Sequence, residues 1–536
     1  MHGKTRERDR DHARLGRNGF GRRGLLGMLA LPALTGATRA AAAKQIVFAP
    51  QAMPASLDPV ATLSPAARTA GLAVFETLYG TDARLNPMPQ MVQRHRIEED
   101  GRQWILQLRP DQMFHDGTPV TARDCVASLR RWMRRDSLGQ TLAERLDTLE
   151  AKESDVLAIR LKHPLPSLPL ILGKSQPGPP VIMPARLAET DAAVPVSGIV
   201  GSGPFRLAEG SWNPGAEFRL ARFDRYTTRV EASNFTGGRR VALVDQVIWR
   251  DTADPVQALR DGTVDWVEAL PPLIPDAAGN DRGIVRDRLN DLGFYAVLRL
   301  NAARGPMTNL RLRQAALAMV DQTAVMETVF GADSGMFTTP AGLFLPGSAF
   351  VNDAGKDRVN AKRSPRAIRA LLSEAGYGGE ALIVLIPTGD AVHEALTGAV
   401  IEELRQAGLT IAARPLSRQA LDTLRDGRAP AGQEDWSAFC DSFPGADHQN
   451  PLGIRAGRDA GIGWPDDPAA GRARAAWIDT DNARVQSTAA ARLQEQMFMT
   501  VPFVPLGQWF ATAAWRDTLS GQQKGTCPVF WNVARA

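Results

Sequence analysis

One stretch of the chain concentrates residues whose types and spacing could do chemistry. It reads "FHDGTPVTARDCVASLRR" and covers residues 114–131. His115 beside Asp116 could be half of a catalytic triad, and both residues together with Cys125 could be ligands of a metal ion. The same residues could instead form a turn that leads into a helix. Asp-Gly is a turn dipeptide, because Gly adopts a positive φ and Asp can bond its own backbone.

The residues after this turn favour the structural interpretation. Thr121 fits the N-cap of a helix, and Asp124, three residues later, can reach back to the cap as in a capping box. Apolar residues then recur at helical spacing. Cys125 is therefore interpreted as a small buried hydrophobic residue rather than a ligand. We expect the whole stretch to be scaffold.

Other chemical motifs are absent from the sequence. It has no H-E-x-x-H pattern, no phosphate-binding P-loop and no G-x-S-x-G nucleophile motif. The histidines beyond residue 43 are widely spread and lie at His95, His115, His163, His393 and His448. The sequence therefore predicts neither an enzyme nor a resident cofactor, although triads can assemble from distant positions.

The charge distribution argues against a nucleic-acid partner. The pI is near 9.3, but nine Lys and Arg and only three acidic residues lie within residues 1–43. Since the whole chain carries +5, the remainder has a net charge of −1. A nearly neutral chain offers no basic field for a phosphate backbone.

Residues 1–43 have the three parts of an export signal. A twin arginine (Arg22–Arg23) precedes an apolar run over residues 25–34, and small residues follow at 41–43. The pair resembles a twin-arginine signal. No Cys lies near the expected cleavage site, and no later apolar run reaches the length of a membrane span. We expect a soluble periplasmic protein without a lipid anchor.

The three cysteines, Cys125, Cys440 and Cys527, allow at most one disulfide. Their spacing matches no metal motif, and pairing of Cys440 with Cys527 stays open.

The predicted elements indicate an α/β protein of several lobes. A strand is expected over residues 44–50 and a hairpin turning at Asp100–Gly101. One helix is expected over residues 309–331. A strand, a helix and a second strand follow over residues 381–387, 391–407 and 409–415, which predicts a partly parallel sheet.

The order of several motifs resembles that of the family 5 extracellular solute-binding proteins, the oligopeptide, dipeptide and nickel receptors of ABC importers. The matching segments are "SLDP" (56–59), "FETLYG" (75–80), the stretch through "FHDGTPVT", "GSGPFRLAEGSW" (201–212) and "TVPFVPLG" (500–507). Together they span roughly residues 44–520.

The resemblance implies an α/β, two-lobed periplasmic-binding-protein fold of the cluster C type, with an extra subdomain in the first lobe. The expected parts are an export signal (1–43), lobe I (44–80), the extra subdomain (81–190), the second part of lobe I (191–285), lobe II (286–500) and a C-terminal return to lobe I (501–536). A ligand would bind between the lobes and favour their closed arrangement.

The resemblance also implies where a ligand would bind, in the segment "DWSAFCDSFPGADHQNPLG" (435–453). Asp441 is the first candidate to pair with a peptide α-amine and Asp447 the second. Cys440 and Ser442 flank Asp441. The expected apolar walls are Trp436, Phe439, Phe443 and Trp464, with Met53 contributed by the early loop.

The function that follows is capture of a peptide or peptide-like solute and its delivery to the permease subunits of an ABC importer, by a protein expected to be monomeric. Two alternatives stay open. The same fold could bind a non-peptide ligand, such as nickel or another metal chelate, haem, an opine or a sugar, and His448 could contribute to a chelate site. The chain could also be an exported enzyme.

Overall fold

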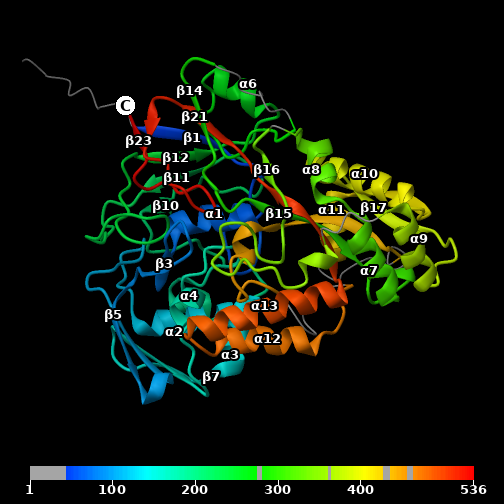
Figure 1. Cartoon of the computed structure of the whole chain (residues 1–536). Coiled ribbons are helices and arrows are strands. Elements are labelled where there is room, and N and C mark those ends of the chain that lie inside the picture. The colour runs from blue at the N-terminus through cyan, green and yellow to red at the C-terminus, as the bar shows by residue number, and fades with distance from the viewer. Residues whose placement is uncertain (1–43, 274–280, 333, 360–363, 426–434, 456–462) are drawn as a thin grey trace, which may run out of the picture. The chain divides into compact units, whose positions relative to one another are not determined.

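The computed structural model describes residues 44–273, 281–332, 334–359, 364–425, 435–455 and 463–536. The expected export signal lies outside these residues. The described chain is a two-lobed mixed α/β protein built on two large sheets (Figure 1). None of its described helices is long and apolar enough to cross a bilayer.

The first large sheet has seven strands, and the expected strand near residue 44 lies at its centre. This strand, β1, runs parallel to both of its neighbours, β12 and β13, while the other pairings are antiparallel. The strand order across the sheet is β10 (Phe205–Leu207), β11 (Phe218–Arg222), β12 (Gln246–Trp249), β1 (Gln45–Ala49), β13 (Trp266–Val267), β21 (Ala513–Arg516) and β14 (Ile284–Asp287).

The second large sheet has six strands and contains the predicted strand–helix–strand unit. Strands β17 and β18 are parallel, and the helix between them in sequence, α10 (Ala391–Gln406), packs against both. This arrangement confirms the prediction. The order is β16 (Phe337–Thr338), β20 (Phe503–Trp509), β15 (Phe294–Leu300), β19 (Ala438–Pro444), β17 (Leu382–Thr388) and β18 (Ile411–Ser417).

The chain passes between the two sheets twice, from β14 to β15 and from β20 back to β21. The two crossings touch: the guanidinium of Arg288 lies 3.7 Å from the ring centre of Phe510. Gly293 in the first crossing has φ +53°, and a Cβ there would come within 2.3 Å of the Trp509 carbonyl oxygen. Glycine is needed where these two segments approach each other.

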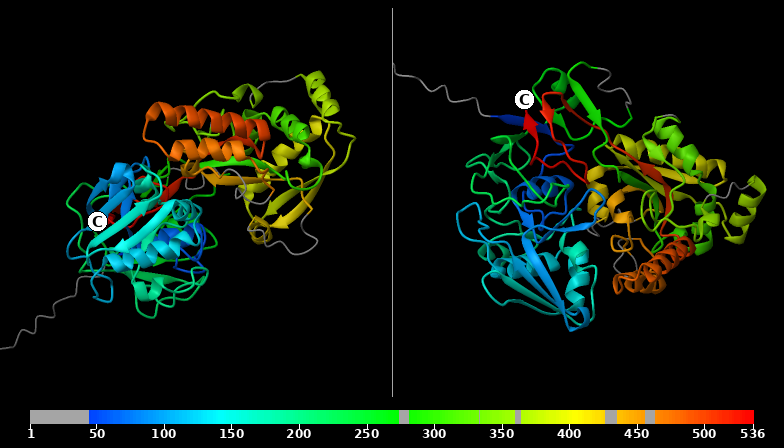
Figure 2. Two further views of the ribbon diagram at one scale, coloured as in Figure 1. Left: turned by 90° about the horizontal axis from the view of Figure 1, so that it is seen from below. Right: turned by 60° about the vertical axis from the view of Figure 1, so that its left-hand side comes forward.

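A smaller four-stranded sheet contains the predicted hairpin, and α2 packs along it (Figure 2). The turn at Asp100–Gly101 joins its first two strands. Its order is β5 (Val92–Glu98), β6 (Gln103–Leu108), β8 (Val156–Leu161) and β7 (Leu146–Ala151), with helices α2 (Ala122–Met133) and α3 (Ser137–Arg145).

The stretch over residues 114–131 is scaffold, as predicted. The Asp124 carboxylate accepts a hydrogen bond from the backbone N–H of Thr121 at 2.9 Å, so the capping box is formed. Both ring nitrogens of His115 bond backbone groups of Gly201 and Gly203. Burial lowers the pKa of His115 to about 4. Because both ring nitrogens are occupied by backbone groups, His115 has no free nitrogen to act as a base or a metal ligand.

The single helix expected over residues 309–331 is wrong, because the structure has two. α7 (Leu310–Met319) ends before Asp321, and α8 (Gln322–Phe330) begins after it. The Asp321 carboxylate accepts hydrogen bonds from the backbone N–H groups of Thr323 and Ala324 and so caps the second helix.

The remaining described helices are α1 (Pro65–Val74), α4 (Leu168–Leu172), α5 (Ala185–Ala188), α6 (Pro255–Arg260), α9 (Pro365–Glu374), α11 (Arg418–Arg425), α12 (Pro468–Ile478), α13 (Ala483–Thr500), and 3-10 turns that include η4 (Gly445–His448). Short strands β2 (Glu76–Thr77), β3 (Tyr79–Thr81), β4 (Pro87–Pro89), β9 (Val181–Ile182), β22 (Leu519–Ser520) and β23 (Ala534–Arg535) complete the fold.

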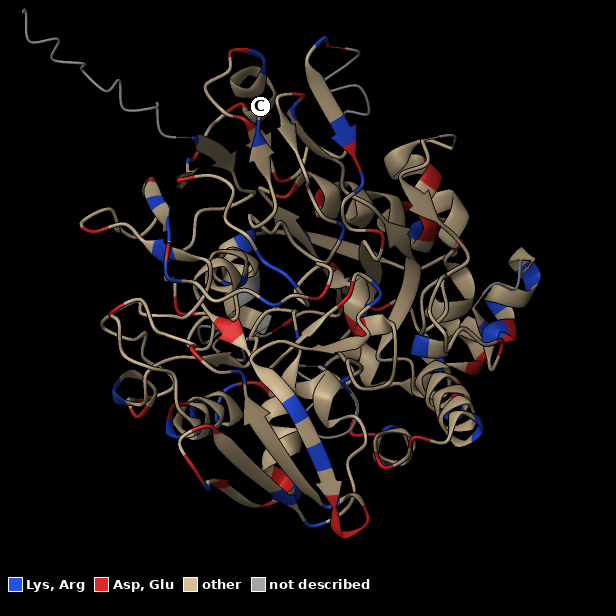
Figure 3. Ribbon diagram, turned by 90° about the vertical axis from the view of Figure 1, so that its left-hand side faces the viewer, with Lys and Arg blue, Asp and Glu red and all other residues tan. Residues whose placement is uncertain are grey.

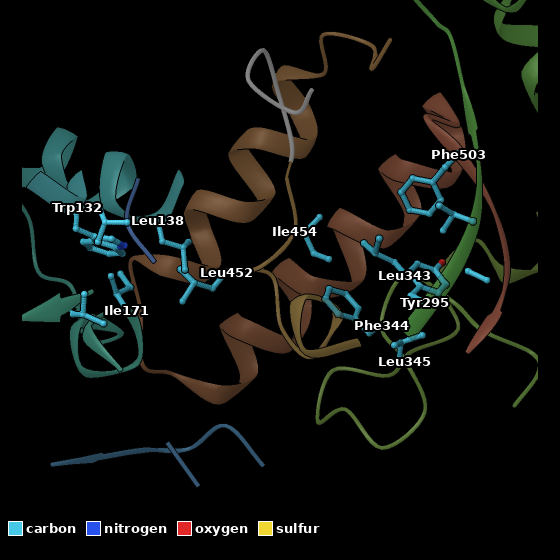
Figure 4. Close-up of a cluster of buried hydrophobic side chains, with 14 of the residues drawn as sticks. Trp132, Leu138, Ile171, Tyr295, Leu343, Phe344, Leu345, Leu452, Ile454 and Phe503 are labelled. Carbon is cyan, nitrogen blue, oxygen red and sulfur yellow. The ribbon is translucent and has the colours of Figure 1, made fainter. Parts of the chain in front are cut away.

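A continuous buried core joins parts of the chain that are far apart in sequence (Figure 4). Leu452, which follows η4, lies beside Leu138 and Ile171 near α2–α4. Basic and acidic residues are interspersed along the described chain (Figure 3).

Candidate functional site

Strand β19 carries five of the nine predicted site residues and lies between β15 and β17. Because successive side chains of a strand point to opposite faces, Phe439, Asp441 and Phe443 share one face. Cys440 and Ser442 share the other, on which α10 packs. One face of β19 therefore carries a carboxylate and two aromatic rings, and the other carries a thiol and a hydroxyl.

Asp441 is buried beside a cation. Its Oδ2 atom lies 3.5 Å from Nη1 of Arg299 on the neighbouring strand β15, and the two side chains are 1% and 7% exposed. Its Oδ1 atom accepts a hydrogen bond from the backbone N–H of Ser442. The Arg299 guanidinium also lies 5.1 Å from the Phe439 ring centre. The carboxylate predicted first as an amine partner therefore already neutralises an arginine of the same sheet.

Trp436, Phe439 and Cys440 are buried in the lobe rather than lying at its surface. The two aromatic rings are 5.0 Å apart and pack in a cluster with Leu385, Leu421 and Leu424. Burial raises the pKa of the Cys440 thiol to about 12. Cys125, Cys440 and Cys527 are all free thiols, which answers the open question about a disulfide.

On the face of β19 that packs against α10, Ser442 belongs to a chain of hydrogen bonds. His393 on α10 has Nδ1 2.7 Å from Asp390 Oδ2 and Nε2 3.0 Å from Ser442 Oγ. The Trp509 indole N–H donates to the same hydroxyl at 3.1 Å, and Arg418 donates to Asp390 at 2.9 Å. The Ser442 hydroxyl therefore accepts a hydrogen bond from Trp509 and is also a hydrogen-bond partner of His393 Nε2.

Phe443 and Trp464 meet in an aromatic group with Phe503 and His448. Ring centres of Phe443 and His448 are 5.5 Å apart and stacked, and those of Phe443 and Trp464 are 6.5 Å apart. Both Phe443 and Trp464 are partly exposed. His448 is buried, and its Nδ1 bonds the Leu343 carbonyl at 2.8 Å. Burial lowers its pKa to about 4, so His448 is a neutral packing residue.

Asp447 lies in η4, and its side chain is partly exposed. Burial raises its pKa to about 6, although Lys174, Arg455 and Arg68 act in the opposite direction. Lys174 is itself ion-paired with Asp136. Among the described residues, no hydrogen-bond donor contacts the Asp447 side chain. The Asp441 carboxylate, in contrast, accepts a hydrogen bond from the backbone N–H of Ser442.

Sequence analysis did not single out two charged residues of the described chain, Arg68 and Glu268. Arg68 on α1 is 6% exposed; its Nη2 atom makes one long bond, 3.4 Å, to Thr69 Oγ1, and its Nε atom has no partner. Glu268 follows β13 and accepts a bond from the backbone N–H of Gln51 at 2.9 Å, while burial raises its pKa. A single Arg in an Ala-rich helix has no motif, so no sequence signal marked it.

Met53 lies in the loop after β1 and is partly buried against the core. Within the described residues, no group of three His, Cys, Asp or Glu side chains is arranged to hold a metal ion. A groove of about 680 Å³ between α12 and α13 contains none of the predicted site residues.

Comparisons with known proteins agree with one another. Residues 86–446 match the family model for bacterial extracellular solute-binding proteins, family 5. The chain is 32% identical over 521 residues to the probable peptide ABC transporter periplasmic-binding protein y4tO of Sinorhizobium fredii, covering 95% of this chain and 97% of the relative.

Two solved structures share the fold. The binding protein AgaA of A. tumefaciens, in complex with agropinic acid, superposes with a TM-score of 0.76 at 20% identity, over 92% of this chain and 99% of that one. A dipeptide-binding protein of Pseudoalteromonas, in complex with Met-Leu, also gives 0.76, at 14% identity, over 92% and 100%. The fold is therefore shared by proteins whose bound molecules differ.

Proposed function

Because the chain belongs to the bacterial extracellular solute-binding proteins of family 5, we propose that it captures a peptide or peptide-like solute and delivers it to an ABC importer. Its relatives are binding proteins of ABC transporters, and the chain is a solute-binding protein rather than an enzyme. The curated relative with 32% identity is named for peptide transport, which supports a peptide over the other ligands.

The observation that carries this proposal is Asp447. A partly exposed carboxylate that accepts no hydrogen bond from the described residues has room for a cationic partner. A peptide α-amine is such a partner, and a charge-assisted hydrogen bond to it would also stabilise the ionised carboxylate. Asp447 rather than Asp441 is therefore the proposed amine-binding residue, since Asp441 already lies beside Arg299.

The aromatic group beside η4 fits the rest of such a ligand. Partly exposed Phe443 and Trp464 offer apolar surface next to Asp447, as binding sites for small molecules usually do. Met53 is proposed to contact the ligand from the other lobe. The buried residues Trp436, Phe439 and Cys440 would act by holding β19 in place.

The proposal includes export and a transporter partner. Residues 1–43 would direct the chain to the periplasm and be removed, leaving a monomeric protein that binds permease subunits.

Thermal unfolding with matched solute mixtures tests the peptide assignment. A ligand that binds only the folded protein at 100 times its Kd adds about 2.7 kcal/mol to stability. We expect a mixture of di- to pentapeptides to raise Tm, and the same mass of free amino acids to leave it unchanged. Stabilisation by nickel–histidine or an opine, with none by peptides, would overturn the assignment.

A further inference from the structure

Helices α12 and α13 enclose a groove that the proposed solute site does not use. The two helices pack against each other (Figure 1), and the groove between them has a volume of about 680 Å³. Its lining residues recur at helical spacing on each wall, among them Ala469, Arg472 and Ala476 on α12, and Val485, Arg492 and Met499 on α13. From the first to the last of the α13 residues, this wall extends over about 21 Å of helix.

The lining of the groove is largely apolar and open to solvent. Val485 is 47% exposed and Met499 is 41% exposed, and both lie on the face of α13 that lines the groove. Single exposed apolar residues are ordinary on a protein surface, but a groove that contains two of them beside several alanines is a contiguous apolar surface. The small side chains of Ala473 and Ala489 would let another helix approach closely.

Arginines outnumber acidic residues in the lining. Arg472 on α12 and Arg484 and Arg492 on α13 are exposed. The acidic residue in the lining is Glu495. Among the residues that the structure describes, none of the three guanidinium groups forms a hydrogen bond or an ion pair. The groove therefore presents cations on both walls that its own protein does not neutralise, and this charge favours an acidic partner.

The same charge argues against occupants from this chain itself. Residues 1–43 contain nine Lys and Arg and three acidic residues, so a groove of positive charge would repel them. A second copy bound through the same groove about a two-fold axis would bring the arginines of the two copies together. An extended peptide would need the unpaired backbone groups of a sheet edge, whereas both walls here are helices.

We propose that this groove docks an amphipathic helix of another protein, with apolar residues along one face and Asp or Glu on both sides of that face. Such helices bind grooves through apolar side chains at i, i+3 or i+4, and i+7. Their acidic side chains would pair with Arg472 on one wall and with Arg484 and Arg492 on the other. An anionic membrane surface has a similar charge, but it is bound by apolar residues that protrude, whereas these line a groove. The docking surface is separate from the proposed solute site.

Site-specific photo-crosslinking in cells that produce the full-length chain tests the proposal. A benzophenone amino acid takes the place of Thr488, which is exposed and lines the groove, and the crosslinked segment is identified by mass spectrometry. The matched control places the same probe at Ser487, which is exposed on α13 outside the groove lining. We expect the Thr488 probe to capture a segment of another protein with apolar residues at helical spacing and acidic residues beside them. The Ser487 probe should give at least about 10-fold less of this product.

Charge variants test how the partner is recognised. Arg484→Glu combined with Arg492→Glu should lower the crosslink yield at least about 10-fold, whereas Arg484→Lys combined with Arg492→Lys keeps the charge and should retain most of it. Because the replaced side chains are exposed, both double variants should unfold at the temperature of the unaltered protein. The rise in Tm with peptides should also be unchanged, so the docking proposal and the peptide function are tested independently.

A crosslink to a second copy of this chain, to lipid alone, or to a segment without acidic residues would overturn the proposal. Absence of any crosslink from the Thr488 probe, or a yield that the charge-reversing substitutions leave unchanged, would also overturn it. Each of these results would leave the peptide function standing, because the residues proposed to bind solute lie outside the groove lining.

Discussion

The Nε2 atom of His393 lies 3.0 Å from the Oγ atom of Ser442, although the two residues are 49 positions apart. With Asp390 on the other ring nitrogen, the order Asp–His–Ser matches that of a catalytic triad. The Ser442 hydroxyl also accepts the indole N–H of Trp509. The network ties α10, β19 and β20 together, and we assign it a positioning role in a binding protein.

This assignment predicts that Ser442→Ala lowers the stability of the protein and leaves its rate of ester hydrolysis unchanged. The substitution leaves the indole N–H of Trp509 without its acceptor and His393 Nε2 without its hydrogen-bond partner, so the free energy of unfolding should fall by about 1–3 kcal/mol. Urea unfolding measures the loss. Hydrolysis of 4-nitrophenyl acetate should proceed equally with both proteins; a serine-dependent rate would contradict the positioning role.

Asp441→Asn should destabilise the protein rather than act only on ligand binding. The change removes the charge that lies 3.5 Å from the buried Arg299 guanidinium, which should cost about 2–4 kcal/mol. Chemical unfolding at pH 7.5 provides the measurement. Asp435→Asn, at an exposed position of the same segment, should change stability by less than about 0.5 kcal/mol. A fully stable Asp441→Asn protein that fails to bind peptides would instead identify Asp441 as the amine partner.

Asp447→Asn should have the opposite effect on stability, and the effect should depend on pH. The folded protein holds the pKa of Asp447 at about 6, above the ordinary value of 3.8, so the folded state binds its proton more tightly. The associated stability is present below about pH 4 and is lost as the pH rises through about 6. Because Asn stays neutral, the variant stripped of solutes should be about 1–3 kcal/mol more stable than the unaltered protein at pH 8.

Unfolding of both proteins at pH 4.5, 6 and 8 measures this difference, which should shrink toward zero at the acid end. A constant difference across that range would show that Asp447 is not the titrating group.

Replacement of Arg22 and Arg23 by Lys should block export. Both arginines are required if the N-terminal segment is read as a twin-arginine signal. Cell fractionation should then find the chain in the cytoplasm at its unprocessed length. Normal processing and periplasmic recovery of the double variant would indicate a general secretory signal instead.

Local patterns in the sequence were enough to predict much of the fold. Thr121 and Asp124 form a capping box because both partners lie within one turn, and the alternation of strand and helix around α10 has a strong hydrophobic pattern. The break between α7 and α8 was missed because apolar residues continue through it. There, the Asp321 side chain competes with the helix backbone and starts a new helix.

The candidate site was harder to predict, because its residues come together only in the fold. The resemblance placed Asp441 before Asp447 as the amine partner; Arg299, 142 positions from Asp441 in sequence, lies beside Asp441 in the fold and favours the reverse order. Arg68 carries no motif, and only the fold shows that its side chain is buried and that its Nε atom has no hydrogen-bond partner.

Identification of the molecules that leave the exported protein on denaturation tests the central claim most directly. A closed binding protein retains its ligand through purification, so native mass spectrometry followed by analysis of the released solutes reports what it captured. We predict short peptides. A single non-peptide species, such as a metal chelate, an opine or a sugar, would contradict the account.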